Sequence, residues 1–455
     1  MIVVRWQLID IRNGELDRQK RDHSRATVIE QRPTSTITIN NKMMINTSKR
    51  LDGIGEYYFS QKLREIDELN KQGKNIINLG IGSPDLPPHP DVIKTLQDES
   101  AKPNVHAYQS YKGSPVLRNA IAAWYKKWYG VELNADTEIL PLIGSKEGIM
   151  HICMTYFENG VGVLVPNPGY PTYSSAIKLS GATPIYYELK EENNYYPNLD
   201  QLERLIKENS QAPLQGMGVK AIFVNYPQMP TGQLPSKKLF EELVAFAKAN
   251  NILIIHDNPY SFILNDSPMS LLSVDGAKDV AIELNSLSKS QNMAGWRVGM
   301  LVSNKQKVDE VLRFKSNMDS GMFLPVQLAA ATALSLPKSW YDSVNAVYKK
   351  RREKVFELLD LLKCEYSKEQ VGMFVWAKAT SPTPPKEGLK NPLGRGGALS
   401  DDVLYNANVF ITPGGIFGSA GENYVRVSLC TPEEKIIESI KRVKEFLVSK
   451  TIANV

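Results

Sequence analysis

Cysteine is scarce in this chain. Its 455 residues include three cysteines, Cys153, Cys364 and Cys430, which lie far apart in apolar surroundings. This spacing offers neither the pairs of a disulfide framework nor the clustered ligands of a zinc site. We therefore expect a protein of a reducing compartment, the cytoplasm, without a bound metal.

Long hydrophobic runs and a strong charge imbalance are also missing. No apolar run approaches the roughly 18 residues that a membrane span requires. The net charge is +5 over the whole chain, and basic residues alternate with acidic ones in segments such as "KKLFEELVAFAKAN". Such alternation is typical of solvated helix faces. The composition therefore favours an ordinary globular protein over a membrane protein or a nucleic-acid-binding protein.

The first 42 residues lack hydrophobic periodicity. They also lack the 7–15-residue apolar core of a signal peptide, and their five acidic residues argue against a transit peptide. We interpret residues 1–42 as a disordered extension, or as the result of a start codon assigned too early, with Met43 or Met44 as the working start. The segment is too short for a separate DNA-binding module.

The remainder of the chain predicts an α/β fold. Short apolar runs at 161–165, 221–224, 252–255 and 280–284 alternate with helical segments. Continuous apolar strands separated by helices indicate a mostly parallel central sheet covered by helices on both faces. After residue 326, long helices lead into shorter strands and a C-terminal helix, which indicates a smaller α+β domain.

These patterns predict four segments. Residues 1–42 are the extension, residues 44–80 an N-terminal arm with part of the small domain, residues 81–325 the large domain, and residues 326–455 the small C-terminal domain.

Polar residues follow several of the predicted strands. "HDNPYSF" ends one strand and places Asp257 after a very apolar run, and "NSLSKSQ" ends another with Lys289 among serines. "GSKEG" at 144–148 opens a helix, whose positive end attracts anions. Arg297 follows Lys289, and Arg426 lies in a predicted strand of the small domain. Because parallel sheets place ligands at the carboxyl ends of their strands, we expect these side chains to share one site.

One cofactor explains this set of residues. Pyridoxal phosphate requires a lysine amine for a Schiff base, an acid beside its pyridine nitrogen, donors for its phosphate and an aromatic face. An amino-acid substrate then requires a cation for its carboxylate. The chain offers a candidate for each requirement.

At these residues the chain resembles the class I/II aminotransferases of the fold-type I pyridoxal-phosphate superfamily. The resemblance runs from about residue 44 to the end. "SLSKSQNMAGWRVG" is similar to the Schiff-base segment of the family, "NPGYPTY" to its ring-stacking loop, "DNPY" to its Asp-x-x-Tyr motif and "RVSL" to its carboxylate-binding arginine. Together, in this order and spacing, the four motifs are a specific signature.

The resemblance implies a role for each catalytic residue. Lys289 forms the internal aldimine with the cofactor and later moves the α-proton of the substrate. Asp257 keeps the pyridine nitrogen protonated, Tyr260 donates to the ring hydroxyl, and Tyr170 stacks on the ring.

The resemblance also implies how the phosphate is held. Ser145, the backbone of Lys146, Ser286 and Arg297 bind it within one subunit. Tyr108 reaches the phosphate of the neighbouring subunit, which implies a homodimer.

The segments implied to bind the substrate depart from the family at one position. Arg426 and the backbone of Gly82 are implied to bind the substrate α-carboxylate. The family has an Asn-Pro-Thr-Gly sequence where this chain has Met229. The missing asparagine bonds the ring hydroxyl and helps to position the carboxylate, and Asn225 and Gln228 are the candidates to replace it.

Three functions fit this reading. The preferred function is transamination between an L-amino acid and a 2-oxo acid such as 2-oxoglutarate. A carbon–sulfur β-lyase shares Lys289, Asp257 and Arg426, and a ligand-sensing regulator keeps the fold without turnover. Dicarboxylate-specific members carry a further arginine near "KSNMDSGMFLP", where this chain has only Lys315 as a cation. We therefore favour neutral or aromatic donors.

Overall fold

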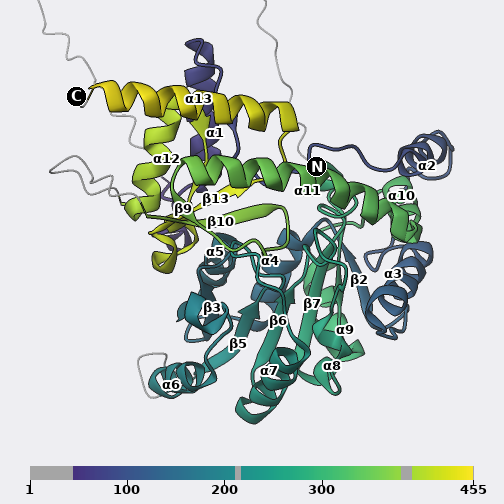
Figure 1. Ribbon diagram of the computed structural model, residues 1–455. Helices are drawn as coiled ribbons and strands as arrows, with labels where there is room; N and C mark the ends of the chain where they lie inside the picture. Colours follow the sequence, from purple (N-terminus) through teal and green to yellow (C-terminus); the bar gives the residue numbers. More distant parts are fainter. Residues whose placement is uncertain (1–44, 211–216, 381–391, 454–455) are drawn as a thin grey trace, which may run out of the picture. The chain divides into compact units, whose positions relative to one another are not determined.

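The computed structural model describes residues 45–210, 217–380 and 392–453 (Figure 1). The described residues from Ser48 onward form one compact unit. The extension predicted at residues 1–42 lies outside the described residues.

A seven-stranded sheet forms the centre of the fold. In spatial order its strands are β2 (Ile139–Leu142), β8 (Gly299–Val302), β7 (Ala281–Ser286), β6 (Leu253–Asp257), β5 (Val219–Val224), β3 (Gly162–Asn167) and β4 (Thr183–Glu188). Strands β7, β6, β5, β3 and β4 are parallel, and β8 runs antiparallel to both of its neighbours. The sequence prediction of a mostly parallel sheet is confirmed.

Both faces of this sheet are covered by helices (Figure 1). In β5, Ala221 and Phe223 pack into one hydrophobic cluster, whereas Ile222 and Val224 pack into another. Because side chains alternate along a strand, one cluster lies on each face of the sheet. Both faces are therefore buried, which explains why the strands are apolar throughout. The helices are α3 (Pro115–Tyr129), α4 (Ser145–Tyr156), α5 (Pro171–Leu179), α6 (Leu199–Ser210), α7 (Lys237–Asn250), α8 (Ala277–Val280) and α9 (Lys305–Lys315).

Local signals in the sequence set the ends of these helices. Ser114 caps α3 by accepting a hydrogen bond from the Leu117 amide, and Pro115 occupies its first turn. Ser236 caps α7 in the same way through the Leu239 amide. Serine at the cap and proline in the first turn are favoured because they satisfy or remove amides that lack a partner within the helix.

Two smaller sheets complete the unit. Strand β1 (Ile77–Asn78) pairs in parallel with β11 (Val409–Phe410). A four-stranded antiparallel sheet has the order β12 (Thr412–Pro413), β13 (Tyr424–Ser428), β10 (Phe374–Ala379) and β9 (Cys364–Glu365). The remaining α-helices are α1 (Tyr58–Lys71), α2 (Pro90–Ser100), α10 (Leu324–Ser335), α11 (Lys338–Leu361), α12 (Gly394–Ala407) and α13 (Glu433–Ala453).

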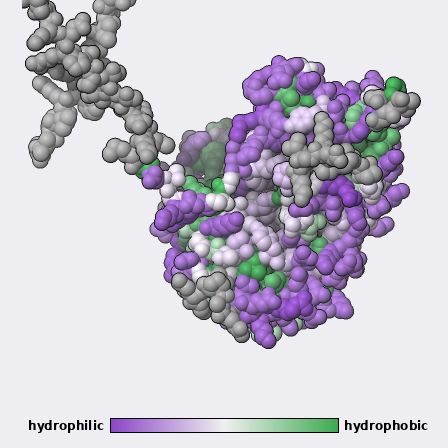
Figure 2. Space-filling view, turned by 90° about the vertical axis from the view of Figure 1, so that its left-hand side faces the viewer, coloured by the Kyte–Doolittle hydropathy of each residue, from purple (hydrophilic) through white to green (hydrophobic). Residues whose placement is uncertain are grey.

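Helices α11 and α13 lie side by side over the four-stranded sheet, which has its own hydrophobic core (Figure 1). This arrangement confirms the smaller α+β part of the predicted fold class. The domain limits at residues 80 and 325 stay predictions. On the face shown in Figure 2, hydrophilic residues surround smaller hydrophobic areas. No helix in the described part of the chain is both long and apolar enough to cross a membrane.

Candidate active site

A cavity of about 640 Å³ lies at the carboxyl ends of β5, β6 and β7. Residues from the four-stranded sheet and from the segments around residues 57–63 and 81–82 also line it. Every site residue predicted from the sequence lines this cavity except Tyr108. The predicted residues in its wall are Gly82, Ser145, Lys146, Tyr170, Asn225, Asp257, Tyr260, Ser286, Lys289, Arg297 and Arg426.

Lys289 lies three residues beyond the end of β7 and points into the cavity. Its Nζ atom donates a hydrogen bond to the Gly82 carbonyl over 2.6 Å and lies 5.9 Å from the centre of the Tyr260 ring. Desolvation lowers the pKa of Lys289, and the positive charges of Arg426 and Arg297 lower it further. With a lower pKa, Lys289 loses its proton more easily. The neutral amine that results is the form that acts as a nucleophile and a base.

Asp257 is the last residue of β6, and 5% of its surface is exposed. The Tyr173 hydroxyl donates to its Oδ2 atom over 2.8 Å, and the Asn225 amide donates to its backbone carbonyl over 2.6 Å. Its Oδ1 atom is buried and has no partner among the described residues. Burial raises the pKa of Asp257 to about 6, although the Tyr173 hydrogen bond opposes this shift. The unpartnered oxygen therefore calls for a donor from a ligand.

The N-terminus of α4 and Arg297 form an anion-binding cup. Gly144 precedes the helix with a φ of +84°, and a Cβ atom built there would lie 2.1 Å from Arg297 Nη2. Glycine thus lets the guanidinium approach the free helix amides, where an anion is favoured by both the amides and the charge. Across the cup, the Ser286 and Ser288 hydroxyls lie 2.8 Å apart. Among the described residues Arg297 forms no ion pair with a carboxylate.

These three features together fit pyridoxal phosphate. The anion cup suits a phosphate, the unpartnered Asp257 oxygen suits a protonated pyridine nitrogen, and the Lys289 amine suits a carbonyl carbon. Tyr170 and Tyr260, which also line the cavity, supply aromatic and hydroxyl groups.

Arg426 lies in the middle of β13 at the opposite end of the cavity, and 4% of its surface is exposed. Its guanidinium lies 3.8 Å from the centre of the Phe374 ring and 4.7 Å from that of Phe417. One nitrogen donates to the Gly80 carbonyl over 2.9 Å, and Nε has no partner. Burial lowers the pKa of Arg426 to about 10, so the side chain remains a cation at neutral pH.

No carboxylate pairs with Arg426 in the part of the chain that the structure describes. A buried cation without an anion is costly. The aromatic rings around the guanidinium offset part of this cost. A bound carboxylate would offset the rest, so the site favours a ligand that carries one.

Met229 occupies the position at which the family has asparagine. Its Sδ atom lies 3.3 Å from Arg426 Nη1, so a weak thioether acceptor stands beside the guanidinium. The amide of Asn225 bonds the backbone at Asp257 and Met229. The amide of Gln228 bonds Pro168 and Thr231. The side-chain amides of Asn225 and Gln228, the two candidates to replace the asparagine, are therefore already hydrogen-bonded within the protein.

Several residues of the cavity wall were missed by the sequence analysis. Tyr173 follows Tyr170 by three residues in the same motif, so helical spacing could have identified it. Ser288 directly precedes Lys289 in the quoted Schiff-base motif, and its position there could have identified it. The others come from segments that carry no motif and reach the cavity through the tertiary fold. The missed residues that bear on the site are Tyr57, Phe59, Tyr173, Ser288, Phe374 and Phe417.

Tyr108 and Lys315 lie outside the cavity wall. Tyr108 is 92% exposed, a position from which it can contact another molecule. Lys315, the only cation in the segment where dicarboxylate-specific members carry an arginine, is 2% exposed, and its Nζ atom bonds both carboxylate oxygens of Asp319 over 2.7 Å. Lys315 is therefore engaged in an internal ion pair.

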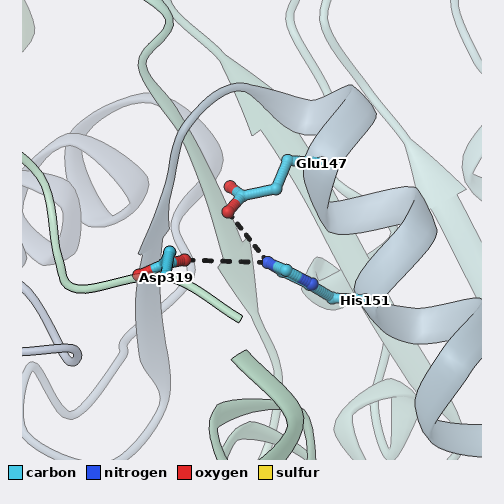
Figure 3. A group of neighbouring side chains, drawn as sticks. All are labelled: Glu147, His151 and Asp319. Carbon is cyan, nitrogen blue, oxygen red and sulfur yellow. Dashed lines mark hydrogen bonds and ion pairs between the residues drawn. The ribbon is translucent and has the colours of Figure 1, made fainter. Parts of the chain in front are cut away.

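The Lys315 ion pair belongs to a polar cluster beside α4. His151 Nε2 lies 2.8 Å from Glu147 and 4.0 Å from Asp319, a spacing that could hold a metal ion (Figure 3). However, the Lys315 ammonium already occupies both oxygens of Asp319, and the second Glu147 oxygen accepts from the Ile143 amide. The Lys315 ammonium thus takes the place beside Asp319 that a metal ion would need.

Comparison with known proteins agrees with this geometry. Residues 74–443 match the family described as aminotransferase class I and II. LL-diaminopimelate aminotransferase of Dehalococcoides mccartyi (strain BAV1) is 38% identical over 88% of this chain and 98% of its own length. The corresponding protein of Aquifex aeolicus is 37% identical over 89% of this chain and 100% of its own length.

Solved structures lead to the same family. Substrate-bound BacF from Bacillus subtilis superposes with a TM-score of 0.79 at 34% identity, covering 88% of this chain and 98% of that one. The aromatic aminotransferase of Pyrococcus horikoshii superposes with a TM-score of 0.73 at 27% identity, covering 85% and 99%. The chain therefore belongs to the class I and II aminotransferases, enzymes that use pyridoxal phosphate to transfer amino groups.

Proposed function

We propose that this aminotransferase moves the amino group of a neutral or aromatic L-amino acid to a 2-oxo acid, with 2-oxoglutarate as the acceptor. The observation that carries the proposal is the composition of the substrate end of the cavity. Phe59, Phe374 and Phe417 surround the Arg426 guanidinium, and the apolar side chains of Leu63 and Ile81 line the same cavity. An apolar wall beside one carboxylate-binding cation suits an amino acid with an uncharged side chain.

The cofactor, when bound, supplies the electron sink that makes the α-proton of the substrate acidic. With the cofactor bound, the Lys289 amine would take this proton from the substrate and later give it back. Asp257 would pair with the ring nitrogen, Tyr260 would donate to the ring hydroxyl, and Tyr170 would offer an aromatic face to the ring. Each of these side chains lines the same cavity.

The phosphate and the substrate carboxylate anchor the two ends of this arrangement. Ser145, the Lys146 backbone, Ser286 and Arg297 hold the phosphate, and Asn225 supports the ring site through its bond to the Asp257 carbonyl. Arg426 and the Gly82 backbone bind the α-carboxylate. For 2-oxoglutarate, the Lys146 ammonium supplies a cation in the cavity wall for the distal carboxylate.

A second candidate donor is LL-diaminopimelate, on which relatives at 37–38% identity act by their names. This donor carries a second ammonium group. Asp257 is the one acidic side chain among the described residues that line the cavity, and it belongs to the cofactor end. The described wall therefore lacks an anion for the second ammonium, which favours an uncharged donor. The comparisons do not favour the β-lyase alternative.

A donor panel tests the proposal. Purified holoenzyme is mixed with L-phenylalanine, L-leucine, L-methionine, L-glutamate or LL-diaminopimelate, and the absorbance change of the cofactor is followed in a single half-reaction. We expect the neutral and aromatic donors to react fastest and 2-oxoglutarate to reverse the change. If the rate constant for LL-diaminopimelate is at least tenfold above those of all other donors, the proposed neutral or aromatic donor is wrong.

We also propose that the enzyme works as a cytoplasmic homodimer. The exposed position of Tyr108 suits a contact with the phosphate of the other subunit, and all three cysteines are buried and unpaired. Sedimentation at assay concentrations tests the assembly. We expect a dimer, and a fully active monomer would contradict the role of Tyr108.

A further inference from the structure

A histidine–glutamate pair is buried in the sheet beneath the active site. His256 on β6 and Glu283 on β7 are register partners, and both are 0% exposed. His256 Nδ1 lies 2.8 Å from Glu283 Oε2. His256 directly precedes Asp257, and because side chains alternate along a strand, it lies on the opposite face of the sheet from the cavity.

Both nitrogens of the His256 ring face acceptors. Nε2 lies 3.0 Å from the Tyr226 carbonyl, which can only accept, so this nitrogen carries a proton. Nδ1 faces the Glu283 carboxylate. A neutral imidazole has one protonated nitrogen, so the charge on the ring depends on the state of Glu283.

Glu283 is surrounded by other donors. Its oxygens accept from the Tyr125 hydroxyl over 2.9 Å, from the Ser270 hydroxyl over 2.8 Å and 3.0 Å, and from the Leu271 amide over 3.0 Å. Both oxygens of Glu283 thus act as acceptors. His256 Nδ1 faces one of these accepting oxygens, so the geometry suits a proton on Nδ1 as well.

His151, a buried histidine in helix α4, differs from His256. His151 Nε2 faces Glu147, but its Nδ1 has no partner among the described residues. His151 thus has one partnered ring nitrogen, whereas His256 has two. The two acceptors at His256 are therefore a specific arrangement rather than a general feature of buried histidines in this fold.

We propose that His256, held between the Glu283 carboxylate and the Tyr226 carbonyl, is an imidazolium that acts as a positioning residue and keeps the neighbouring Asp257 ionised, so that this carboxylate can hold the proton on the cofactor ring. The inference rests on the proposed role of Asp257. The titratable groups close to the pair are Tyr125 and Tyr129, both from α3. On the cavity side, the titratable groups near Asp257 are Tyr173, Tyr170, Tyr260 and Lys289.

The charge balance at Asp257 supports this role. Burial raises the pKa of Asp257 to about 6, close to the working pH, whereas the Tyr173 hydrogen bond and the charges of His256 and Lys289 lower it. Without the imidazolium the carboxyl would be protonated at a higher pH, and a protonated Asp257 cannot bind a protonated ring nitrogen as an ion pair.

The charge on His256 can be measured without any variant of the pair. The chain contains five histidines. In ¹⁵N-histidine-labelled protein, replacing the other four one at a time by glutamine assigns the His256 ring. We expect ¹⁵N shifts of two protonated nitrogens at about pH 7, because both ring nitrogens face acceptors. One unprotonated ring nitrogen at this pH would overturn the inference, whatever donor the enzyme uses.

The effect on Asp257 is measured through cofactor binding. The cofactor-free protein is titrated with pyridoxal phosphate at a series of pH values, and the affinity of the wild type should fall as the pH drops through about 6. In His256→Gln this acid midpoint should move up by about one pH unit, because the charge that favours ionised Asp257 is gone.

The matched control places the same substitution in an Asp257→Asn background. If His256 acts through Asp257, His256→Gln shifts no midpoint there. An equal loss of affinity at all pH values, with or without Asp257, would show a merely structural role and overturn the proposal. If His256→Gln does not fold, the ¹⁵N measurement alone decides. A failure of both tests with normal transamination would leave the proposed function intact.

Discussion

The two ends of the active-site cavity are built in different ways. At the cofactor end, Asp257 and Lys289 follow neighbouring parallel strands of one sheet, and each has hydrogen-bond partners within the chain. At the carboxylate end, Arg426 comes from a second sheet and is surrounded by aromatic rings and a thioether. The cofactor end thus depends on the sheet topology that the family shares, whereas the carboxylate end is where this chain departs from it.

This difference separates chemistry from substrate choice. The groups that perform proton transfer are fixed by strand ends, so substitutions there should abolish turnover. The groups around Arg426 set how tightly and in which orientation a carboxylate is held, so substitutions there should change binding first.

The largest effect is expected at Lys289. Lys289→Ala removes both the amine that binds the cofactor covalently and the base, so turnover should fall by at least about 10⁴-fold. Steady-state assays measure the loss, and the exposed Lys178→Ala serves as the control with unchanged activity. Retention of more than one per cent of the wild-type rate in Lys289→Ala would contradict the assignment.

Asp257→Asn should have the next largest effect. The variant keeps the size of the side chain and should still bind cofactor, but it cannot hold a proton on the ring by charge. We expect proton transfer to slow by about 10²–10⁴-fold in single-turnover measurements. Near-normal turnover would show that the ring works without a carboxylate partner.

Arg426→Lys should act mainly on binding. A lysine cannot form the two parallel bonds that a guanidinium makes with a carboxylate, and the loss should reach about 2–4 kcal/mol, or roughly 30- to 700-fold in KM. The KM of amino acids and oxo acids should rise together while the absorbance of the resting enzyme stays the same. An unchanged KM with a lower melting temperature would identify Arg426 as a structural residue.

The smallest effect is expected at Met229, and it is a gain. The thioether sulfur of Met229 lies 3.3 Å from the Arg426 guanidinium, and Met229→Asn replaces it with an amide donor. One hydrogen bond to a charged group should tighten binding of a carboxylate inhibitor such as 3-phenylpropionate by about tenfold. Met229→Leu is the matched control and should leave the affinity unchanged. Equal affinities in all three proteins would show that position 229 does not contact the carboxylate.

The sequence predicted the cofactor end better than the carboxylate end for a physical reason. Strand ends such as Asp257 and the helix start at Ser145 carry local signals, because apolar runs and turn residues fix where they lie. Phe374 and Phe417 were missed because their own segments only indicate buried strands and turns. Their approach to Arg426 depends on how the two sheets pack, which no local pattern encodes.

The fold shows the same division. The strands β3, β5, β6 and β7 were predicted within two residues at each end, because each is a continuous apolar run. Strand β8 was not predicted, since "GMLV" is a four-residue run next to the Lys289 motif. Its antiparallel place in the sheet follows from pairing with β2 and β7, a long-range property.

The central claim is that Lys289 carries the cofactor, and one measurement tests it directly. Yellow holoenzyme is treated with borohydride, which fixes the covalent adduct between cofactor and lysine, and is then digested and analysed by mass spectrometry. The account predicts one modified peptide, the one that contains Lys289. A modified peptide containing any other lysine, or the absence of any modified peptide, would contradict it.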